Sequence, residues 1–407
     1  MNLAYARWIE TEFEKAPLEI IDGDRGKNYP KQSDFSNSGY CLFLNTGNVT
    51  SSGFNFSECN FISRERDAAL RKGRLQKGDV LLTTRGTVGN TAWVDDTIPY
   101  SVMRINSGMV IIRPNTEKLL PEFLYFFLRS PKFGEQVNSL TSGTAQPQLP
   151  IRDLKGIKIP LPPLEEQRRI AAILDKADDV RRKRKQAIAL TEELLRSAFL
   201  EMFGDPVTNP KGWEVRKLSD LIVGKPNNGV FRKNDEYSGN IPVVWVKELF
   251  SGHIIDCTNS RTLDPTDKEI KNFGLKKGDI LFCRSSLKLE GIGYNNVFDG
   301  DDYSALFECH TIRVSPDQCR VNSIFLNYLL RQPGPRKHLI TRANTVTMST
   351  IGQDEVMQIL VPLPPKPIQD NFEKLLRYVM SVQQKLMIND EQNLFNSLLQ
   401  KAFRGEL

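Results

Sequence analysis

The sequence is poor in histidine and cysteine, the residues that most often bind transition metals. Its 407 residues include three histidines and six cysteines, with no CxxC pair. Cys309, His310 and Cys319 cluster loosely, but their spacing matches no zinc-binding signature. Buried reduced thiols are the simpler interpretation of the cysteines, with a metal site as the alternative. We therefore expect no metal and no other cofactor.

The sequence also lacks the motifs of the common catalytic centres. It contains no GxxxxGK[ST] phosphate loop, no GxSxG elbow and no HExxH helix. An Asn/Asp-Pro-Pro-aromatic tetrad, with which amino-methyltransferases hold a target base, is absent as well. Gly291 and Gly293 form an isolated glycine pair that is more typical of a turn than of a nucleotide site. We expect a non-catalytic protein, and an enzyme with an unfamiliar site is the alternative.

Long hydrophobic runs are missing too. No stretch of eighteen apolar residues occurs, and the N-terminal MNLAYARWIETEFEK lacks the apolar core of a signal peptide. A cytoplasmic protein without a membrane segment is expected. Hydrophobic residues make up 40% of the chain, which is enough for folded cores. The net charge of +6 permits nucleic-acid binding, but so small an excess indicates that a partner supplies part of the electrostatic attraction.

The most informative feature present is an internal repeat of about 200 residues. LQKGDVLLTTRG at Leu75 recurs as LKKGDILFCRSS at Leu275, at an offset of 200. IKIPLPPLEEQ at Ile157 recurs as ILVPLPPKPIQ at Ile359, and LLRSAFLEMFGD at Leu194 recurs as LLQKAFRGEL at Leu398. The order of the three markers is kept, so the chain contains two copies of one unit.

Each copy begins with a mixed α/β part. Short β-rich segments predict strands at VLLTTRG and TAWV, and in the second copy at ILFCRS and YNNVF. The KGD turn before the first of these strands needs glycine, Gly78 or Gly278, for a tight bend. Apolar spacing predicts helical segments from Pro121 and from Ser323.

A proline-rich block then precedes a long helix in each copy, because consecutive prolines are excluded from a helix interior. Residues 165–203 contain no proline or glycine and predict a helix about 58 Å long. A second helix is expected from about Gln369 to Phe403. The two helices are expected to pair as an antiparallel coiled coil with the α/β parts at opposite ends, related by a pseudo-twofold axis. Asn389 and Asn393 would either lie buried in the seam or leave it as the apolar stripe rotates.

The densest basic run, Arg181 to Lys185, falls in the middle of the first long helix. Asp175, Asp178 and Asp179 lie one turn upstream. Pairs such as Asp178 with Arg182 are typical of a solvated helix face. Docking to a partner or to a phosphate backbone is the alternative for this run.

The duplicated order of these elements resembles the specificity subunits of type I restriction–modification systems over essentially the whole chain. The resemblance is carried by SGTAQPQLPIRDLKGIKIPLPPLEEQRRIAAILD, the second IxxPLPPxxxQ block and the terminal KAFRGEL. IDGDRGKNYPK, from Ile21, also looks like the start of one class of their recognition domains. The second block departs from the pattern, because KPI replaces LEE before its glutamine.

The resemblance implies a mixed α/β (α+β) fold with two target-recognition domains and two helical spacers. We place the domains at residues 1–160 and 205–362, and the spacers at 161–204 and 363–407. It further implies that each domain reads one half of an asymmetric bipartite double-stranded DNA site. Two methyltransferase subunits would dock on the helices, and two motor-nuclease subunits would join for restriction.

Base edges in the major groove are read mainly by Arg, Lys, Asn, Gln and Thr side chains on loops. Each such residue can equally be an ordinary surface residue, and phosphate contacts are expected to outnumber base contacts. The candidates in the first domain are Arg25, Lys27, Tyr29, Arg85, Thr144, Gln146 and Gln148. Those in the second are Lys225, Asn227, Asn228, Arg232, Arg284, Lys288, Asn344, Thr345 and Thr347.

A function of a different class remains open at this point. The two α/β parts could bind proteins instead of DNA, which would make the chain a coiled-coil scaffold. Specific DNA binding in the presence of methyltransferase subunits separates the two hypotheses.

Overall fold

The computed structural model describes residues 8–140, 147–345, 348–387 and 391–407, with the backbone alone at residues 234, 345 and 391–393. The chain divides into two compact units. Unit 1 comprises Met1–Lys185 and Asn389–Leu407, and unit 2 comprises Gln186–Ile388. Among the described residues, no helix is both long and apolar enough to span a membrane.

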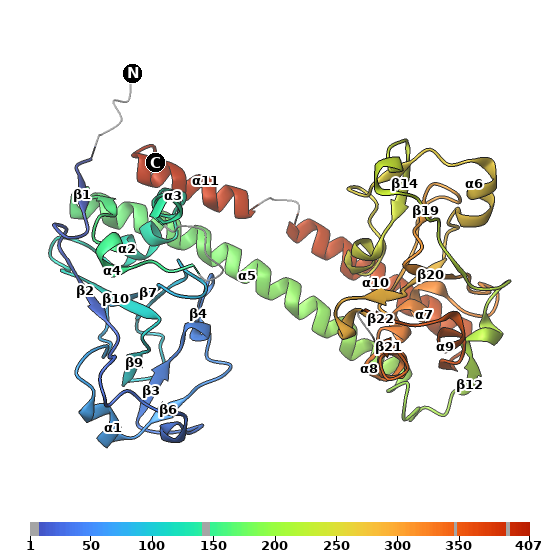
Figure 1. Cartoon of the computed structure of the whole chain (residues 1–407), viewed down its shortest axis with the longest axis horizontal. Coiled ribbons are helices and arrows are strands. Elements are labelled where there is room, and N and C mark those ends of the chain that lie inside the picture. Colours follow the sequence, from blue (N-terminus) through green and yellow to red (C-terminus); the bar gives the residue numbers. More distant parts are fainter. Residues whose placement is uncertain (1–7, 141–146, 346–347, 388–390) are drawn as a thin grey trace. The chain divides into compact units, whose positions relative to one another are not determined.

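Unit 1 contains eleven described strands and a set of mostly short helices (Figure 1). The strands are β1 (Glu10–Glu12), β2 (Leu18–Asp22), β3 (Cys41–Leu44), β4 (Val49–Thr50), β5 (Gly53–Phe54), β6 (Phe61–Ile62), β7 (Val80–Thr83), β8 (Thr91–Trp93), β9 (Met103–Ile105), β10 (Met109–Pro114) and β11 (Lys158–Pro160). The helices are α1 (Arg64–Ala69), α2 (Pro121–Leu128), α3 (Pro131–Leu140), α4 (Ile151–Leu154), the first part of α5 (Leu164–Phe203) and α11 (Glu391–Arg404), with 3₁₀ turns η1 (Gln32–Asp34) and η2 (Thr46–Asn48).

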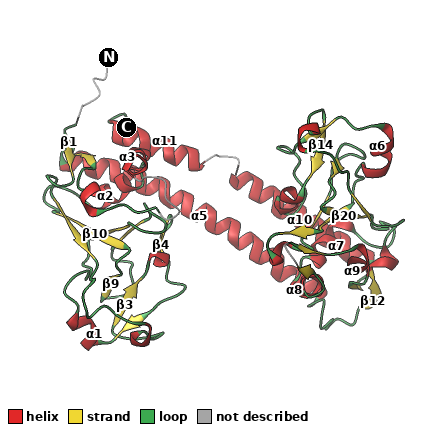
Figure 2. Ribbon diagram, in the orientation of Figure 1, coloured by secondary structure: helices red, strands yellow, loops and turns green. Residues whose placement is uncertain are grey.

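Unit 2 repeats most of this order (Figure 2), but its described residues lack a counterpart of the β4–β5 pair and form an added three-stranded sheet. Its strands are β12 (Glu214–Lys217), β13 (Asn227–Asn228), β14 (Ile241–Val244), β15 (Thr262–Leu263), β16 (Ile280–Cys283), β17 (Ser285–Ser286), β18 (Asn295–Val297), β19 (Leu306–Phe307), β20 (Thr311–Val314), β21 (Asn344–Thr345), β22 (Ser349–Thr350) and β23 (Leu360–Leu363). Its helices are the second part of α5, α6 (Asp267–Phe273), α7 (Ser323–Leu330), α8 (Pro333–Ile340), α9 (Gln353–Met357) and α10 (Lys366–Met387), with 3₁₀ turns η3 (Leu218–Leu221), η4 (Asn234–Glu236), η5 (Val246–Phe250) and η6 (Leu289–Gly291).

The sheets confirm that the sequence repeat is a structural repeat. A four-stranded sheet has the order β2-β10-β7-β8 in unit 1 and β13-β20-β16-β18 in unit 2. A three-stranded sheet has the order β6-β3-β9 in unit 1 and β15-β14-β19 in unit 2, with one parallel pair in each. The strands β7, β8, β16 and β18 fall where the sequence predicted them, so the mixed α/β fold is confirmed.

The KGD turn performs the same task in both units. Gly78 and Gly278 have positive φ angles of 87° and 93°, which favour glycine in the tight bend. The aspartate that follows is buried and accepts a hydrogen bond from a backbone N–H three residues earlier, over 2.7 Å at Asp79 and 2.9 Å at Asp279. The motif therefore both turns the chain and anchors the start of a central strand.

The helical segments predicted from Pro121 and Ser323 are each two helices. The first ends at Leu128 in unit 1 and at Leu330 in unit 2. A second helix starts at Pro131 or Pro333, where the missing N–H of proline is tolerated in the first turn of a helix but not in its interior. Apolar spacing alone does not reveal this break.

The long helix is confirmed, because α5 is a continuous helix of 40 residues. Within unit 2 its second part runs antiparallel to α10. Phe199 contacts Phe372 with ring centroids 5.3 Å apart, and Gln383 donates to Thr191 over 2.9 Å. Residues later in α5 contact residues earlier in α10, as expected for an antiparallel pair.

Unit 1 contains a matching antiparallel pair, formed by the first part of α5 and the C-terminal helix α11. Arg169 donates to the Leu407 carbonyl over 2.8 Å, and Arg181 lies 5.3 Å from the Phe395 ring centroid. Phe395 and Phe403 are buried in the same core as Ile170. The region expected as one helix from Gln369 to Phe403 is thus described as α10 in unit 2 and α11 in unit 1. Asn389 lies outside the described residues, as does the side chain of Asn393.

The glutamine of each proline-rich block holds the helix that follows the block, α5 or α10, against its unit. Gln167 is buried, accepts from the Leu120 N–H over 2.9 Å and donates to the Pro162 carbonyl over 2.9 Å. Gln369 is also buried, accepts from the Asn322 N–H over 2.8 Å and donates to the Pro364 carbonyl over 2.6 Å. The two blocks act alike although KPI replaces LEE, because the glutamine carries the contacts.

Part of the basic run is fixed by a buried carboxylate. Asp178 receives two hydrogen bonds from Arg129, over 3.0 and 3.1 Å, and a third from Arg181 over 2.9 Å. Arg182 lies 3.8 Å from the same carboxylate, so the predicted pair with Asp178 is present at long range. Asp178 thus faces the core, whereas Lys183 pairs with the half-exposed Asp179 over 2.8 Å, as on a solvated helix face.

Candidate nucleic-acid interface

Most of the predicted contact residues that the structure describes gather at one end of the four-stranded sheet in each unit. In unit 1 the end of β2 lies beside the start of β10, since Asp22 is registered opposite Val110. The end of β7 lies beside the same strand, with Thr83 opposite Met109. The loops that leave β2 and β7 therefore emerge close together. The register is equivalent in unit 2, where Cys283 lies opposite Thr311.

In unit 1 these loops surround the turn between β9 and β10, at residues 106–108. The exposed Arg85 donates its backbone N–H to the Gly108 carbonyl over 3.2 Å and is bridged to Gln148. Arg25, whose side chain is 48% exposed, donates to the Ser107 carbonyl over 3.4 Å. Lys27 is exposed on the same loop as Arg25. The structure thus brings together four candidates that come from three separate loops.

Tyr29 has a different environment from the other candidates of unit 1. Its ring packs edge-on against Phe43 with centroids 5.8 Å apart, and its hydroxyl accepts from the Ser107 N–H over 3.5 Å. These contacts give Tyr29 a packing role beside the cluster. Thr144 and Gln146 lie outside the described residues.

In unit 2 the candidates occupy the same sheet end except Lys225, which precedes β13 and lies toward the opposite end, because Asn227 is registered opposite Arg313 and Val223 donates to the Ser315 carbonyl. Lys225 and Lys288 are exposed, whereas Asn227 and Asn228 are half-buried on β13. The amide of Asn227 donates to the Asn272 carbonyl over 3.1 Å, and that of Asn228 accepts from Gln353 over 3.3 Å. Both amides are therefore partly engaged within the protein.

The two arginines of unit 2 are anchored as well. Arg232 donates to both carboxylate oxygens of Glu269, over 3.0 and 2.9 Å. Arg284 donates to the Cys309 carbonyl over 3.4 Å and is half-buried. Asn344 is exposed on β21; the side chain of Thr345, on the same strand, and the whole of Thr347 lie outside the described residues.

An open hollow of about 840 Å³ lies at this end of unit 2. Its walls come from η5, from the β16–β18 connection and from the turn between β19 and β20. Trp245 forms one side and lies under the guanidinium of Arg261, 5.0 Å from the ring centroid. Basic and apolar side chains both line the hollow: Lys247, Arg261, Lys288, Phe250, Leu287 and Met348.

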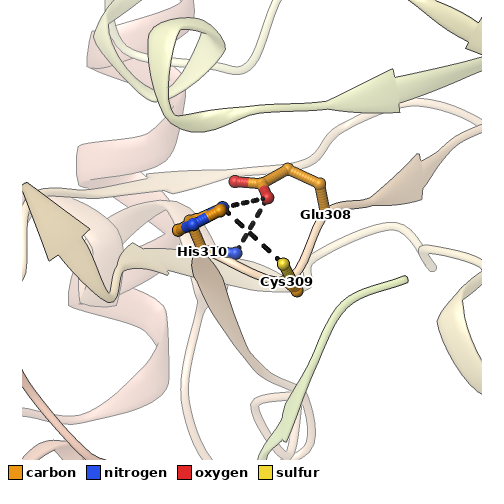
Figure 3. Close-up of side chains that lie close together, drawn as sticks. All are labelled: Glu308, Cys309 and His310. Atoms are coloured by element: carbon orange, nitrogen blue, oxygen red, sulfur yellow. Dashed lines mark hydrogen bonds and ion pairs between the residues drawn. The ribbon is translucent and has the colours of Figure 1, made fainter. Parts of the chain in front are cut away.

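The β19–β20 turn presents Glu308, Cys309 and His310 (Figure 3). The buried Glu308 carboxylate accepts from the His310 backbone N–H over 2.9 Å and lies 2.7 Å from its Nδ1. His310 also lines the hollow, with 49% of its side chain exposed. Glu308 was not predicted from the sequence, because the cluster proposed there consisted of Cys309, His310 and Cys319.

The same three residues offer ligand atoms within 4.8 Å of one another and are the one such group in the part of the chain that the structure describes. The bond to Glu308 already occupies Nδ1 of His310. Burial and the Glu308 carboxylate raise the pKa of the Cys309 thiol, which disfavours the thiolate that a metal ion requires. These contacts suit an imidazole fixed by a carboxylate better than a metal centre.

The equivalent turn of unit 1 has the same backbone contacts but different side chains. Asn106 accepts from the Gly108 N–H over 2.9 Å, as Glu308 does from His310. Arg85 donates to the Gly108 carbonyl as Arg284 does to that of His310. Unit 2 thus adds an imidazole and a carboxylate to a turn that both units share.

The family model for the type I restriction modification DNA specificity domain matches residues 18–190 and 210–390, one match for each repeat. The chain belongs to this family. The resemblance seen in the sequence is therefore confirmed. The matched ranges cover both sheet ends described above.

Relatives and a solved structure agree with this assignment. The MjaIX specificity subunit of Methanocaldococcus jannaschii is 26% identical over 353 residues, covering 81% of this chain and 78% of the relative. The EcoKI specificity subunit of Escherichia coli K12 is 22% identical over 409 residues, covering 94% and 86%. The type I S subunit of M. genitalium has a similar fold, with a TM-score of 0.60 at 14% identity over 99% of this chain and 98% of the other.

Proposed function

We propose that this chain is the non-catalytic DNA-recognition subunit of a type I restriction–modification complex. Each unit reads one half of an asymmetric bipartite site. The observation that carries the proposal is that two sheets of identical strand order direct loops of different sequence from the same end. One scaffold with two sets of readout residues is what recognition of two unlike half-sites requires.

The assembled complex would contain two methyltransferase and two motor-nuclease subunits. It would act as an adenine-N6 DNA methyltransferase and an ATP-dependent endonuclease, with both active centres on the partners. The long helices would fix the spacer between the half-sites and dock the methyltransferase subunits. The exposed side chains of Leu190, Leu194 and Tyr378 on α5 and α10 support a partner surface there.

The readout would combine base and phosphate contacts. Arg85, Gln148 and Arg25 in unit 1, and Lys288 in unit 2, have the exposure and position that suit DNA, whereas the exposed Lys225 lies toward the opposite end of its sheet. Arg232 and Tyr29 are held by protein contacts and would act by shaping their loops.

The test is to co-express the chain with its methyltransferase partner and to map methylated adenines across a host genome. A bipartite motif with an unspecified spacer is expected. Arg85→Ala should relax or weaken the first half-site alone by about 1–3 kcal/mol if Arg85 contacts a base.

Weakening on all sequences together with a shallower salt dependence would identify Arg85 as a phosphate contact. Methyl transfer to DNA by the isolated chain, or the absence of any motif from the active complex, would contradict the proposal. The second result would favour the scaffold hypothesis.

A further inference from the structure

The β19–β20 turn of unit 2 carries a feature that unit 1 lacks. His310 occupies the position of Gly108, and Glu308 that of Asn106. The bond from the backbone N–H fixes the carboxylate, and the bond to Nδ1 holds the imidazole against its own turn. A buried carboxylate is not needed to form the turn, since Asn106 forms it without one.

The contacts determine which atom of His310 is available to a ligand. Nδ1 faces the Glu308 carboxylate, so it carries a proton and donates. Within the described chain, no hydrogen-bond partner is recorded for Nε2. The side chain is 49% exposed and lines the hollow, whose walls also contain Lys247 and Lys288. Nε2 is thus a fixed polar atom beside cationic groups that suit a polyanion.

We propose that His310 is a specificity-determining residue that contacts a base edge in the second half-site through Nε2, with Glu308 as its positioning residue. This inference rests on the proposed function of the chain. A side chain fixed by a buried partner loses less conformational entropy on binding than a free one, which suits discrimination between bases. Leu287 and Met348 add apolar surface beside His310, and DNA seated over the open hollow would shield the contact from water and strengthen it.

The experiment maps genomic methylation by the complete complex that contains His310→Ala. One base position of the second half-site should become degenerate, with discrimination there reduced roughly tenfold, within the range of a base contact. The first half-site should be unchanged. Glu308→Gln should give a smaller relaxation at the same position, because the amide keeps the turn but holds the imidazole less firmly.

Cys319→Ala is the matched control, since Cys319 is exposed in the same unit and does not line the hollow. It should leave the motif unchanged. An unaltered motif in the His310→Ala complex would overturn the inference. Uniform weakening on all sequences would overturn it too, because it would show a phosphate contact. In either case a bipartite wild-type motif would leave the proposed function standing, whereas its absence would refute both.

Discussion

The two units share a backbone framework but differ in the partners of a buried arginine. In unit 1, Arg129 at the end of α2 makes two hydrogen bonds to the buried Asp178. In unit 2, Arg331 occupies the equivalent place, and Met380 stands where Asp178 would be. Arg331 donates instead to the backbone carbonyls of Asn295 and Gly252, each over 2.7 Å.

The pKa values follow this difference. Burial lowers the pKa of Arg129, but the bonds and charge of Asp178 more than offset it, so the pKa is raised overall. Burial also lowers the pKa of Arg331, with no bonded carboxylate to offset it. In both units, therefore, an arginine holds the end of this helix, but among the described residues only unit 1 uses a salt bridge to do so.

The largest expected difference between the units is therefore at Asp178. Asp178→Asn removes one partner of a buried pair, which costs about 3–5 kcal/mol because Arg129 is left buried without its counter-charge. Hydrogen exchange of the α2 and α3 peptides in the full chain measures the loss. Met380→Leu at the matching site of unit 2 should cost less than about 1.5 kcal/mol. Equal losses would show that the charge pair is not what distinguishes the units.

The KGD aspartates give the second comparison. Asp79 accepts two bonds from Arg113, over 2.7 and 2.8 Å, whereas Asp279 lies 3.9 Å from Arg313 and accepts from Ser315 over 2.6 Å. Asp79→Asn should cost about 2–3 kcal/mol at pH 7, because it breaks a charged double hydrogen bond. Asp279→Asn should cost less than about 1 kcal/mol, measured by exchange of the adjoining strand peptides.

The pH dependence of two of these variants should have opposite signs. Burial raises the pKa of Asp279, so wild-type stability from this group is present below its unfolded pKa and is lost as pH rises through the folded pKa. The cost of Asp279→Asn should therefore shrink from acid to neutral pH. Burial also raises the pKa of Asp178, but the hydrogen bonds and charges of Arg129 and Arg181 lower this pKa by more than burial raises it, so the net shift is a decrease. The cost of Asp178→Asn should grow over the same range, and a parallel trend for both variants would refute the assignment.

The smallest difference is expected at the glutamines of the proline-rich blocks. Gln369→Ala leaves one N–H and one carbonyl without their partner, and Gln167→Ala leaves one N–H and the carbonyls of Pro162 and Lys118 without theirs. Each change costs about 1–3 kcal/mol. Since two of the contacts match and Gln167 makes one further hydrogen bond, to the Lys118 carbonyl, the two losses should agree within about 1 kcal/mol when each unit is followed by exchange of its own peptides. A larger difference would mean that the replacement of LEE by KPI does alter how the helix after each block is held.

Local chemistry explains which parts of the fold were predictable. The strands β7 and β16, the KGD turns and the absence of helix breakers over residues 165–203 are all set by neighbouring residues. The packing of α11 into the core of unit 1 was not predictable, because its apolar stripe is compatible with more than one core. The helix breaks before Pro131 and Pro333 could have been predicted from the prolines, but the apolar spacing continues across them and suggested single helices.

The candidate interface was predictable in outline and not in detail. Loop composition predicted Arg85 and Lys288, which are exposed, and equally Arg232 and Tyr29, which are held by Glu269 and Phe43. The pair of Glu308 and His310 could have been found by aligning the two repeats. The alignment places these residues opposite Asn106 and Gly108, and only the second copy has titratable side chains in this turn.

Independent reading of the two half-sites by the two units can be tested directly. The most direct measurement exchanges residues 213–350 for the corresponding segment of another specificity subunit of this family and maps the methylated motif of the resulting complex. The second half-site is expected to change to that of the donor, while the first half-site and the spacer remain as in the parent. A motif altered in both halves, or one that keeps the parental second half-site in an active complex, would contradict independent reading.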